Sequence, residues 1–149
     1  MTQTLAQNLL HIVFSTKERR FYLQNADLRA RLHAYMAGTL RGLDSTAMRI
    51  GGTSDHVHIL CSLSPKRALS DVVRDVKTSS SKWAKQEGVE SFAWQAGFSA
   101  FSVSASNADQ VEEYIANQER HHAKLDFKAE LKFILEKNGV GYDERYLFD

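Results

Sequence analysis

The order of apolar and polar residues along the chain predicts alternating strands and helices. Short apolar or β-branched runs bounded by turn residues are typical of strands, and apolar residues spaced three and four apart are typical of helices with one buried face. The elements predicted in this way are, in order, a strand at 9–14, a helix at 28–43, strands at 47–53 and 56–63, a helix from 69 that closes at Gly88, a strand at 99–103, a helix at about 107–122 and a last helix from 126 to 138.

Capping residues support the two C-terminal helices. Asn107 can cap the helix that follows it, and Asp126 can cap the last helix, which Asn138 and Gly139 end. The tail from residue 141 to 149 is aromatic and charged, and we expect it to dock on the surface.

The first six elements run strand, helix, strand, strand, helix, strand. This order predicts an α+β fold of the ferredoxin-like βαββαβ type, as in RNA-recognition domains, with an antiparallel four-stranded sheet and helices packed on one face. The last two helices are additions to it. With no linker and no internal repeat in the sequence, we expect residues 1–149 to form a single domain, with the C-terminal helix and tail at about 126–149.

Composition limits the partners and the compartment. The chain has 149 residues, is 43% hydrophobic, and carries a formal charge of +1, so any binding of nucleic acid must depend on local basic clusters. No apolar run is long enough for a membrane span, and the N-terminus does not resemble a signal peptide. The single cysteine, Cys61, is consistent with the reducing cytoplasm and is interpreted as a core residue.

The most informative stretch is Asp55–Leu60, which contains His56 and His58. Side chains alternate across a strand, so these two imidazoles point to the same face and form half of a site for a divalent metal. Cys61 falls on the opposite face. The alternative interpretation is a pair of half-buried structural histidines, and strand geometry alone does not decide between the two.

Tyr114 and Gln118 lie four residues apart on the helix predicted at 107–122. They therefore share one helix face, where a phenol and an amide interrupt an apolar stripe. Alone, they are typical of an interface tyrosine and a solvent-facing glutamine. Together with the histidine pair, they suggest a third metal ligand and a neighbouring nucleophile.

Basic residues cluster after the first strand and along the second helix, where they could follow a phosphate backbone or simply be solvated. The candidates for DNA contact are Lys17, Arg19, Arg20, Arg74, Lys77 and Lys82. Four other histidines are given no direct role: His11 and His33 are interpreted as structural, and His121 and His122 as exposed, although one of the latter pair could support the site or face DNA.

In combination, these motifs resemble the single-tyrosine HUH transposases, the insertion-sequence enzymes that move single-stranded DNA, and their REP-associated relatives. Asp55–His58 resembles the metal motif and Tyr114–Gln118 the catalytic helix. His11–Lys17 is similar to the first strand and its exit, Trp94–Val103 to the segment before the catalytic helix, and Asp143–Asp149 to the tails of family members.

The resemblance implies a mechanism and partners. His56, His58 and Gln118 would hold Mg²⁺ or Mn²⁺, and Tyr114 would attack a DNA phosphate, remain joined to the 5′ end and release a 3′-hydroxyl. Family members bind hairpins near element ends and act as homodimers, so we expect both here. Two imidazoles and an amide oxygen would suit Zn²⁺ or Mn²⁺ at least as well as Mg²⁺, so the preference for Mg²⁺ comes from the family.

Two other functions compete with DNA transposition. A non-catalytic nucleic-acid-binding module would share the fold and the basic second helix, but the aromatic platform motif of RNA-binding sheets is missing from the sequence. A small metal-dependent hydrolase would use a bound water instead of Tyr114, but no dedicated water-activating base is evident in the sequence.

Overall fold

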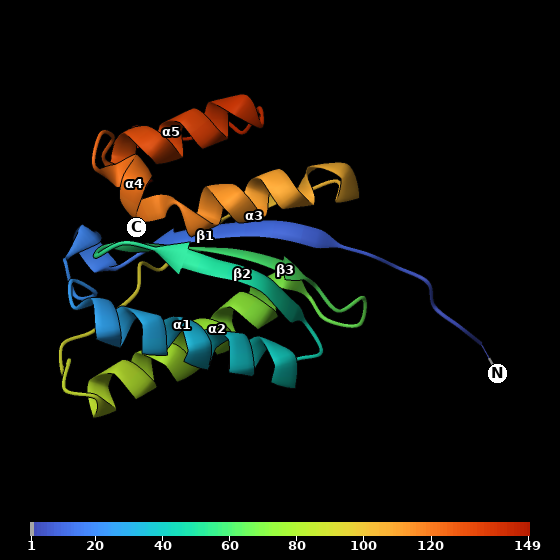
Figure 1. Ribbon diagram of the computed structural model, residues 1–149, viewed down its shortest axis with the longest axis horizontal. Helices are drawn as coiled ribbons and strands as arrows, with labels where there is room; N and C mark the ends of the chain where they lie inside the picture. The colour runs from blue at the N-terminus through green and yellow to red at the C-terminus, as the bar shows by residue number, and fades with distance from the viewer. Residues whose placement is uncertain (1) are drawn as a thin grey trace.

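An antiparallel sheet forms the centre of the molecule (Figure 1). The computed structural model describes residues 2–149, and within them the sheet has four strands in the order β2-β3-β1-β4. Both central pairings, β1 with β3 and β2 with β3, are antiparallel, and so is the pairing of β1 with β4. The predicted ferredoxin-like α+β fold is confirmed. The strands are β1 (Leu9–Ser15), β2 (Thr46–Gly52), β3 (His56–Ser62) and β4 (Ser99–Ser102).

Helices cover both faces of this sheet. In Figure 1, α1 and α2 pack on one face, and α3, α4 and α5 lie over the other. No helix within residues 2–149 is long and apolar enough to cross a membrane. The α-helices are α1 (Ala26–Gly42), α2 (Leu69–Gln86), α3 (Ala108–Ala116), α4 (Gln118–His122) and α5 (Phe127–Lys137), and short 3-10 turns occupy Lys17–Arg19, Ala105–Asn107 and Glu144–Tyr146.

Alternation along the central strands divides their side chains between two layers. Val57, Ile59 and Cys61 of β3 join the apolar core beneath α1 and α2. The predicted core position of Cys61 is confirmed, and burial raises the pKa of its thiol to about 11. Val13 of β1 points the other way, into a smaller apolar cluster with Phe101 and the inner face of α5. The two histidines of β3 therefore lie on the face that α3–α5 cover.

The structure differs from the predicted helix at 107–122. That segment is broken at Asn117, whose backbone leaves the helical conformation (φ −102°, ψ 21°), so α3 ends and α4 begins in a new direction. The Asn117 side chain stabilises the end of α3 by donating a hydrogen bond to the Glu113 carbonyl oxygen (3.0 Å). The sequence pattern did not reveal this break because asparagine is only a weak helix breaker.

The two predicted N-caps have different outcomes. The Asp126 side chain accepts a hydrogen bond from the Ala129 backbone N–H (2.9 Å), so its cap is confirmed. The prediction for Asn107 was wrong, because its side chain makes no capping hydrogen bond. A 3-10 turn at 105–107 places Asn107 in a near-helical conformation (φ −103°, ψ −3°) instead of the extended one that capping requires.

A close backbone contact fixes the end of α3 against the sheet. A Cβ added at Gly51 of β2 would collide with the carbonyl oxygen of Ile115 and lie 2.9 Å from its Cγ2 atom. Ile115 is itself buried, so this turn of α3 rests directly on the strand. The absence of a side chain at Gly51 thus sets how near Tyr114 and Gln118 come to β3.

We predict that replacing Gly51 by alanine lowers the free energy of unfolding by about 1–3 kcal/mol, because the added methyl group pushes against backbone that packing holds in place. Gly38→Ala is the matched control. Gly38 is exposed within α1 and has open space around it, so alanine should stabilise the helix by about 0.5–1 kcal/mol. Urea denaturation of the three proteins measures both effects, and a fully stable Gly51→Ala protein would contradict the close contact.

Candidate active site

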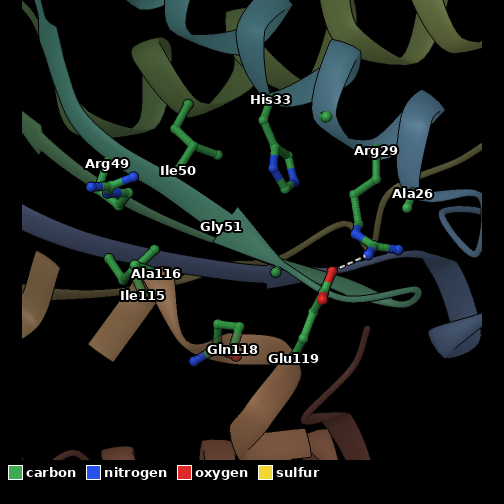
Figure 2. Close-up of a pocket in the computed structure, with 12 residues that line it drawn as sticks. Ala26, Arg29, His33, Arg49, Ile50, Gly51, Ile115, Ala116, Gln118 and Glu119 are labelled. Atoms are coloured by element: carbon green, nitrogen blue, oxygen red, sulfur yellow. Dashed lines mark hydrogen bonds and ion pairs between the residues drawn. The ribbon is translucent and has the colours of Figure 1, made fainter. Parts of the chain in front are cut away.

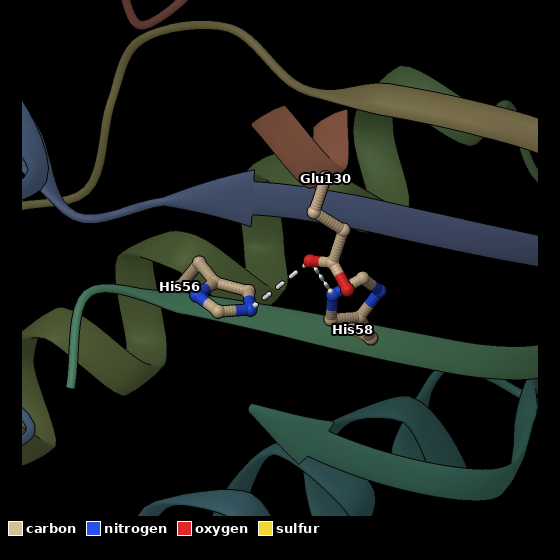
Figure 3. Close-up of side chains that lie close together, drawn as sticks. All are labelled: His56, His58 and Glu130. Carbon is tan, nitrogen blue, oxygen red and sulfur yellow. Dashed lines mark hydrogen bonds and ion pairs between the residues drawn. The ribbon is translucent and has the colours of Figure 1, made fainter. Parts of the chain in front are cut away.

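The two histidines of β3 project side by side beneath α5. His56 and His58 are both fully buried, and their rings lie 5.1 Å apart between centroids. Figure 3 shows both imidazoles turned toward Glu130, which descends from α5. The predicted common orientation of the pair is therefore present in the structure.

His56 is oriented by the residue that precedes it. Its Nδ1 lies 2.8 Å from an Asp55 carboxylate oxygen, which can only accept, so Nδ1 carries the proton and donates. In the neutral ring, Nε2 then has a lone pair. That lone pair faces the Gln118 amide oxygen at 2.9 Å and a Glu130 oxygen at 3.5 Å. Three electron-pair donors thus converge on one point.

His58 is oriented by His11 on the neighbouring strand. His58 Nδ1 lies 2.8 Å from His11 Nε2, and the two rings stack at 5.1 Å. The other nitrogen, Nε2, is 3.1 Å from Glu130. Burial lowers the pKa of His58 to about 4 and that of His11 to about 3, so both rings are neutral near pH 7 and either tautomer is accessible.

The break at Asn117 brings Gln118 into this cluster. Gln118 is 1% exposed, and its amide nitrogen donates to a Glu130 carboxylate oxygen (3.0 Å). That bond fixes the orientation of the amide, because it leaves the amide oxygen facing His56. The structure therefore brings Gln118 to the histidine pair.

Tyr114 reaches the same place from α3. Its hydroxyl donates to Glu130, and its ring lies 5.9 Å from that of His58, edge to face. Burial and the negative charge of Glu130 raise the pKa of the phenol well above its ordinary value, so it is protonated at neutral pH. All four groups predicted to converge, the phenol, the amide and the two imidazoles, do so within one chain.

Glu130 is the central residue that sequence analysis missed. It is 1% exposed and accepts hydrogen bonds from His58, His122, Gln118 and Tyr114. Burial alone would raise the pKa of its carboxyl, but the hydrogen bonds from His122, His58 and Tyr114 outweigh that effect and hold it well below the usual range. One signal was present in the sequence: Glu130 falls on the apolar stripe formed by Phe127, Leu131 and Ile134.

Two further histidines have roles that the sequence analysis did not give them. His11 was interpreted as structural, but it is the hydrogen-bond partner of the metal-facing His58. His122 was interpreted as exposed, but it is mostly buried and lies 3.0 Å from Glu130. Both departures have one cause, because α5 covers this face of the sheet and turns nearby polar side chains inward.

The predicted DNA-contacting residues lie in two places. Thr16 donates to the Asp55 carbonyl oxygen (2.8 Å), so the basic turn that follows it lies at the His56 end of β3. The residues on α2 are on the opposite side of the sheet from Tyr114 (Figure 1). There Lys77 donates to three carbonyl oxygens in the loop at 95–97, and burial lowers its pKa to about 8. Contact with DNA remains a prediction for all six.

Two cavities flank the cluster. One, of about 380 Å³, lies against Tyr114 and Glu130 and is lined by Arg120, His121 and Lys124. The second, of about 220 Å³, lies beside Gln118 between α1, β2 and α4. Figure 2 shows this second cavity, which the ion pair of Arg29 with Glu119 crosses.

The arrangement of donors fits a divalent cation. Ligand atoms about 2.1 Å from one ion lie about 3.0–3.4 Å from each other in octahedral or tetrahedral geometry. The separations here are 2.9, 3.1 and 3.5 Å among His56 Nε2, His58 Nε2, the Gln118 amide oxygen and the Glu130 oxygen. His56, His58 and Glu130 form a buried group whose ligand atoms are close enough to share an ion. Asp55 and His11 supply the outer hydrogen bonds that orient metal-binding imidazoles.

Two solved structures share the fold. A presumed transposase from Deinococcus radiodurans has a TM-score of 0.63 at 19% sequence identity, covering 79% of this chain and 98% of that chain. A REP-associated tyrosine transposase bound to a REP hairpin has a TM-score of 0.61 at 14% identity, covering 84% of this chain and 74% of that chain. None of the curated proteins matches this chain.

The sequence also matches a protein family directly. The family described as "Transposase IS200 like" matches residues 4–118, from the segment before β1 to the first residue of α4. This region covers more than half of the chain and contains the histidine pair, Tyr114 and Gln118, which agrees with the resemblance found in the sequence. The chain belongs to the IS200-like transposase family.

Proposed function

We propose that this transposase cuts and rejoins single-stranded DNA through a covalent link between Tyr114 and the 5′-phosphate. Its main support is the position of Glu130, whose carboxylate is contacted at once by the Tyr114 hydroxyl and by His58. A phosphate placed between the phenol and the imidazole pair would have the nucleophile on one side and the metal ligands on the other. A hydrolase that uses a bound water has no need of a tyrosine in that position.

In the proposed reaction, the Tyr114 oxygen forms a bond to phosphorus and the bond from phosphorus to the 3′ oxygen breaks. The phenol loses its proton, and the departing 3′ oxygen gains one. Rejoining reverses the step with a new 3′-hydroxyl, so the energy of the phosphodiester is kept in the covalent link. Because the environment raises the pKa of the phenol, Tyr114 needs help to lose its proton.

His56, His58 and Gln118 are the proposed ligands of Mg²⁺ or Mn²⁺. When bound, the cation would neutralise charge on the phosphate and make the phosphorus easier to attack. The chain's own groups prepare the site: Asp55 holds the Nε2 lone pair of His56 inward, and Glu130 fixes the amide of Gln118. The burial of both imidazoles keeps bulk water away from these ligands.

The proposed DNA path runs through the cavity beside Tyr114. Arg120, His121 and Lys124 line it, and basic side chains at its walls would attract a phosphate backbone. The similar REP-associated transposase is bound to a hairpin, which supports hairpin DNA as the substrate here. One tyrosine holds one DNA end at a time, so exchange between two ends supports action as a homodimer.

The first prediction concerns the nucleophile. Labelled single-stranded hairpins taken from the DNA that flanks the gene, incubated with Mn²⁺ and the protein, should give an adduct that survives denaturing electrophoresis. Tyr114→Phe should abolish it, because phenylalanine has no oxygen to attack phosphorus. Tyr142→Phe changes an exposed tyrosine remote from the cluster and should leave the adduct unchanged. An adduct that persisted in Tyr114→Phe would refute the assignment.

The second prediction concerns the metal. Mn²⁺ at 100 times its dissociation constant should stabilise the wild type by about 2.7 kcal/mol, seen as a rise in melting temperature. His58→Asn should lose this rise, because it removes an imidazole ligand, while His33→Asn on α1 should retain it. Chelation should remove the adduct as well. Equal Mn²⁺ stabilisation of the His58→Asn protein would exclude His58 as a ligand.

The third prediction concerns DNA binding. The double change Arg120→Ala with Lys124→Ala should weaken hairpin binding and flatten its salt dependence by about 1.4, at about 0.7 for each lost phosphate contact on a single strand. Arg74→Ala with Lys82→Ala removes equal charge from α2, on the other side of the sheet, and serves as the comparison. Binding titrations across a range of salt concentrations measure both. If only the α2 variant loses affinity, the path lies on that side.

A further inference from the structure

Glu130 lies outside the region shared with the family, yet it occupies the centre of the cluster. The family match ends at Gln118, whereas Glu130 is carried by the added helix α5. Removing a carboxylate from water costs several kcal/mol unless charge or hydrogen bonds compensate. A glutamate on the apolar face of a helix, 1% exposed and directed at two imidazoles, therefore calls for a specific role.

We propose that Glu130 is a fourth ligand of the divalent cation, so that the bound ion also fastens α5 over the active site. The inference rests on the proposed metal-dependent function. It adds a carboxylate to a ligand set that otherwise consists of two imidazoles and an amide.

The geometry divides the two oxygens of Glu130 between two tasks. One oxygen, Oε1, lies 3.1 Å from His58 Nε2 and 3.5 Å from His56 Nε2, which is the spacing of atoms that share one ion. The other, Oε2, accepts from the Tyr114 hydroxyl and the Gln118 amide. A ligand bond through Oε1 leaves both bonds to Oε2 intact, so Glu130 would connect the nucleophile to the ion.

A tautomer change in His58 makes room for the ion. Without it, His58 Nε2 carries the proton and donates to Glu130, and Nδ1 accepts from His11. With it, the proton would sit on Nδ1 and be donated to His11 Nε2, which leaves Nε2 free to coordinate. The neutral His11 ring accommodates both arrangements without gaining a charge.

A carboxylate also changes which ion the site prefers. Two imidazoles and an amide are neutral, and they suit Zn²⁺ at least as well as Mg²⁺. Glu130 adds a negatively charged oxygen, the ligand that Mg²⁺ and Mn²⁺ favour. The source of the preference for these harder ions would thus be α5, and not the histidine motif.

The test compares Mn²⁺ binding with the mobility of α5. Calorimetric titration with MnCl₂ is performed on the wild type, Glu130→Gln, Glu130→Asp and the control Glu136→Gln, which removes an exposed charge from the same helix. Circular dichroism without metal establishes that each variant is folded. Hydrogen exchange of the amides in 127–137 is followed with and without Mn²⁺.

We expect Glu130→Gln to weaken Mn²⁺ binding at least about tenfold, because a ligand contributes no less than an outer hydrogen-bond partner. Glu130→Asp should weaken it too, since its carboxylate is one methylene shorter, and Glu136→Gln should not. Mn²⁺ should slow hydrogen exchange in α5 of the wild type.

Wild-type affinity or tighter binding in a folded Glu130 variant would overturn the proposal, and so would wild-type α5 exchange that Mn²⁺ does not alter. The exchange measurement needs no variant, so it decides the question even if the substitutions prevent folding. Loss of Mn²⁺ binding in His58→Asn alongside unchanged binding in Glu130→Gln would refute the role of Glu130 and leave the proposed function standing. No binding of Mn²⁺ by the wild type would refute both.

Discussion

The alternation of side chains along β3 is the constraint on which the structure depends. This strand pairs with β1 on one side and β2 on the other, so both of its faces are buried. One face supplies Val57, Ile59 and Cys61 to the apolar core, and the other supplies His56 and His58 to the polar cluster. A slip of one residue would place imidazoles in the core and thiol and methyl groups in the site. Two neighbouring strands and two incompatible layers together exclude that slip.

The polar layer is stable because the buried imidazoles have partners. Asp55 and His11 satisfy the outer nitrogens of His56 and His58, and Glu130 and Gln118 face the inner ones. The same helix that provides Glu130 also provides apolar cover: the Phe127 ring stacks on His56 at 4.0 Å. Packing and chemistry are therefore joined in α5, and neither can be altered without affecting the other.

Much of this could be predicted from the sequence, and the remainder has clear physical reasons. Periodicity gave the sheet, the hairpin of β2 with β3 and the face that carries the histidines, because strand alternation is a local property. Spacing placed Tyr114 and Gln118 together, although the turn at Asn117, which aims the amide, was not visible. Glu130, His11 and His122 depend on contacts between distant segments. A search of α5 for a charged residue on its apolar stripe would have found Glu130 alone.

The ion pair of Arg29 with Glu119 has a consequence for self-association. Arg29 comes from α1 on one face of the sheet and Glu119 from α4 on the other, so the pair spans the rim near the end of β2, beside the cavity in Figure 2. Unpaired backbone groups on an outer strand invite another chain to add a strand. Here a guanidinium and a carboxylate stand in the way at that end, so uncontrolled growth of the sheet from β2 would first have to separate them.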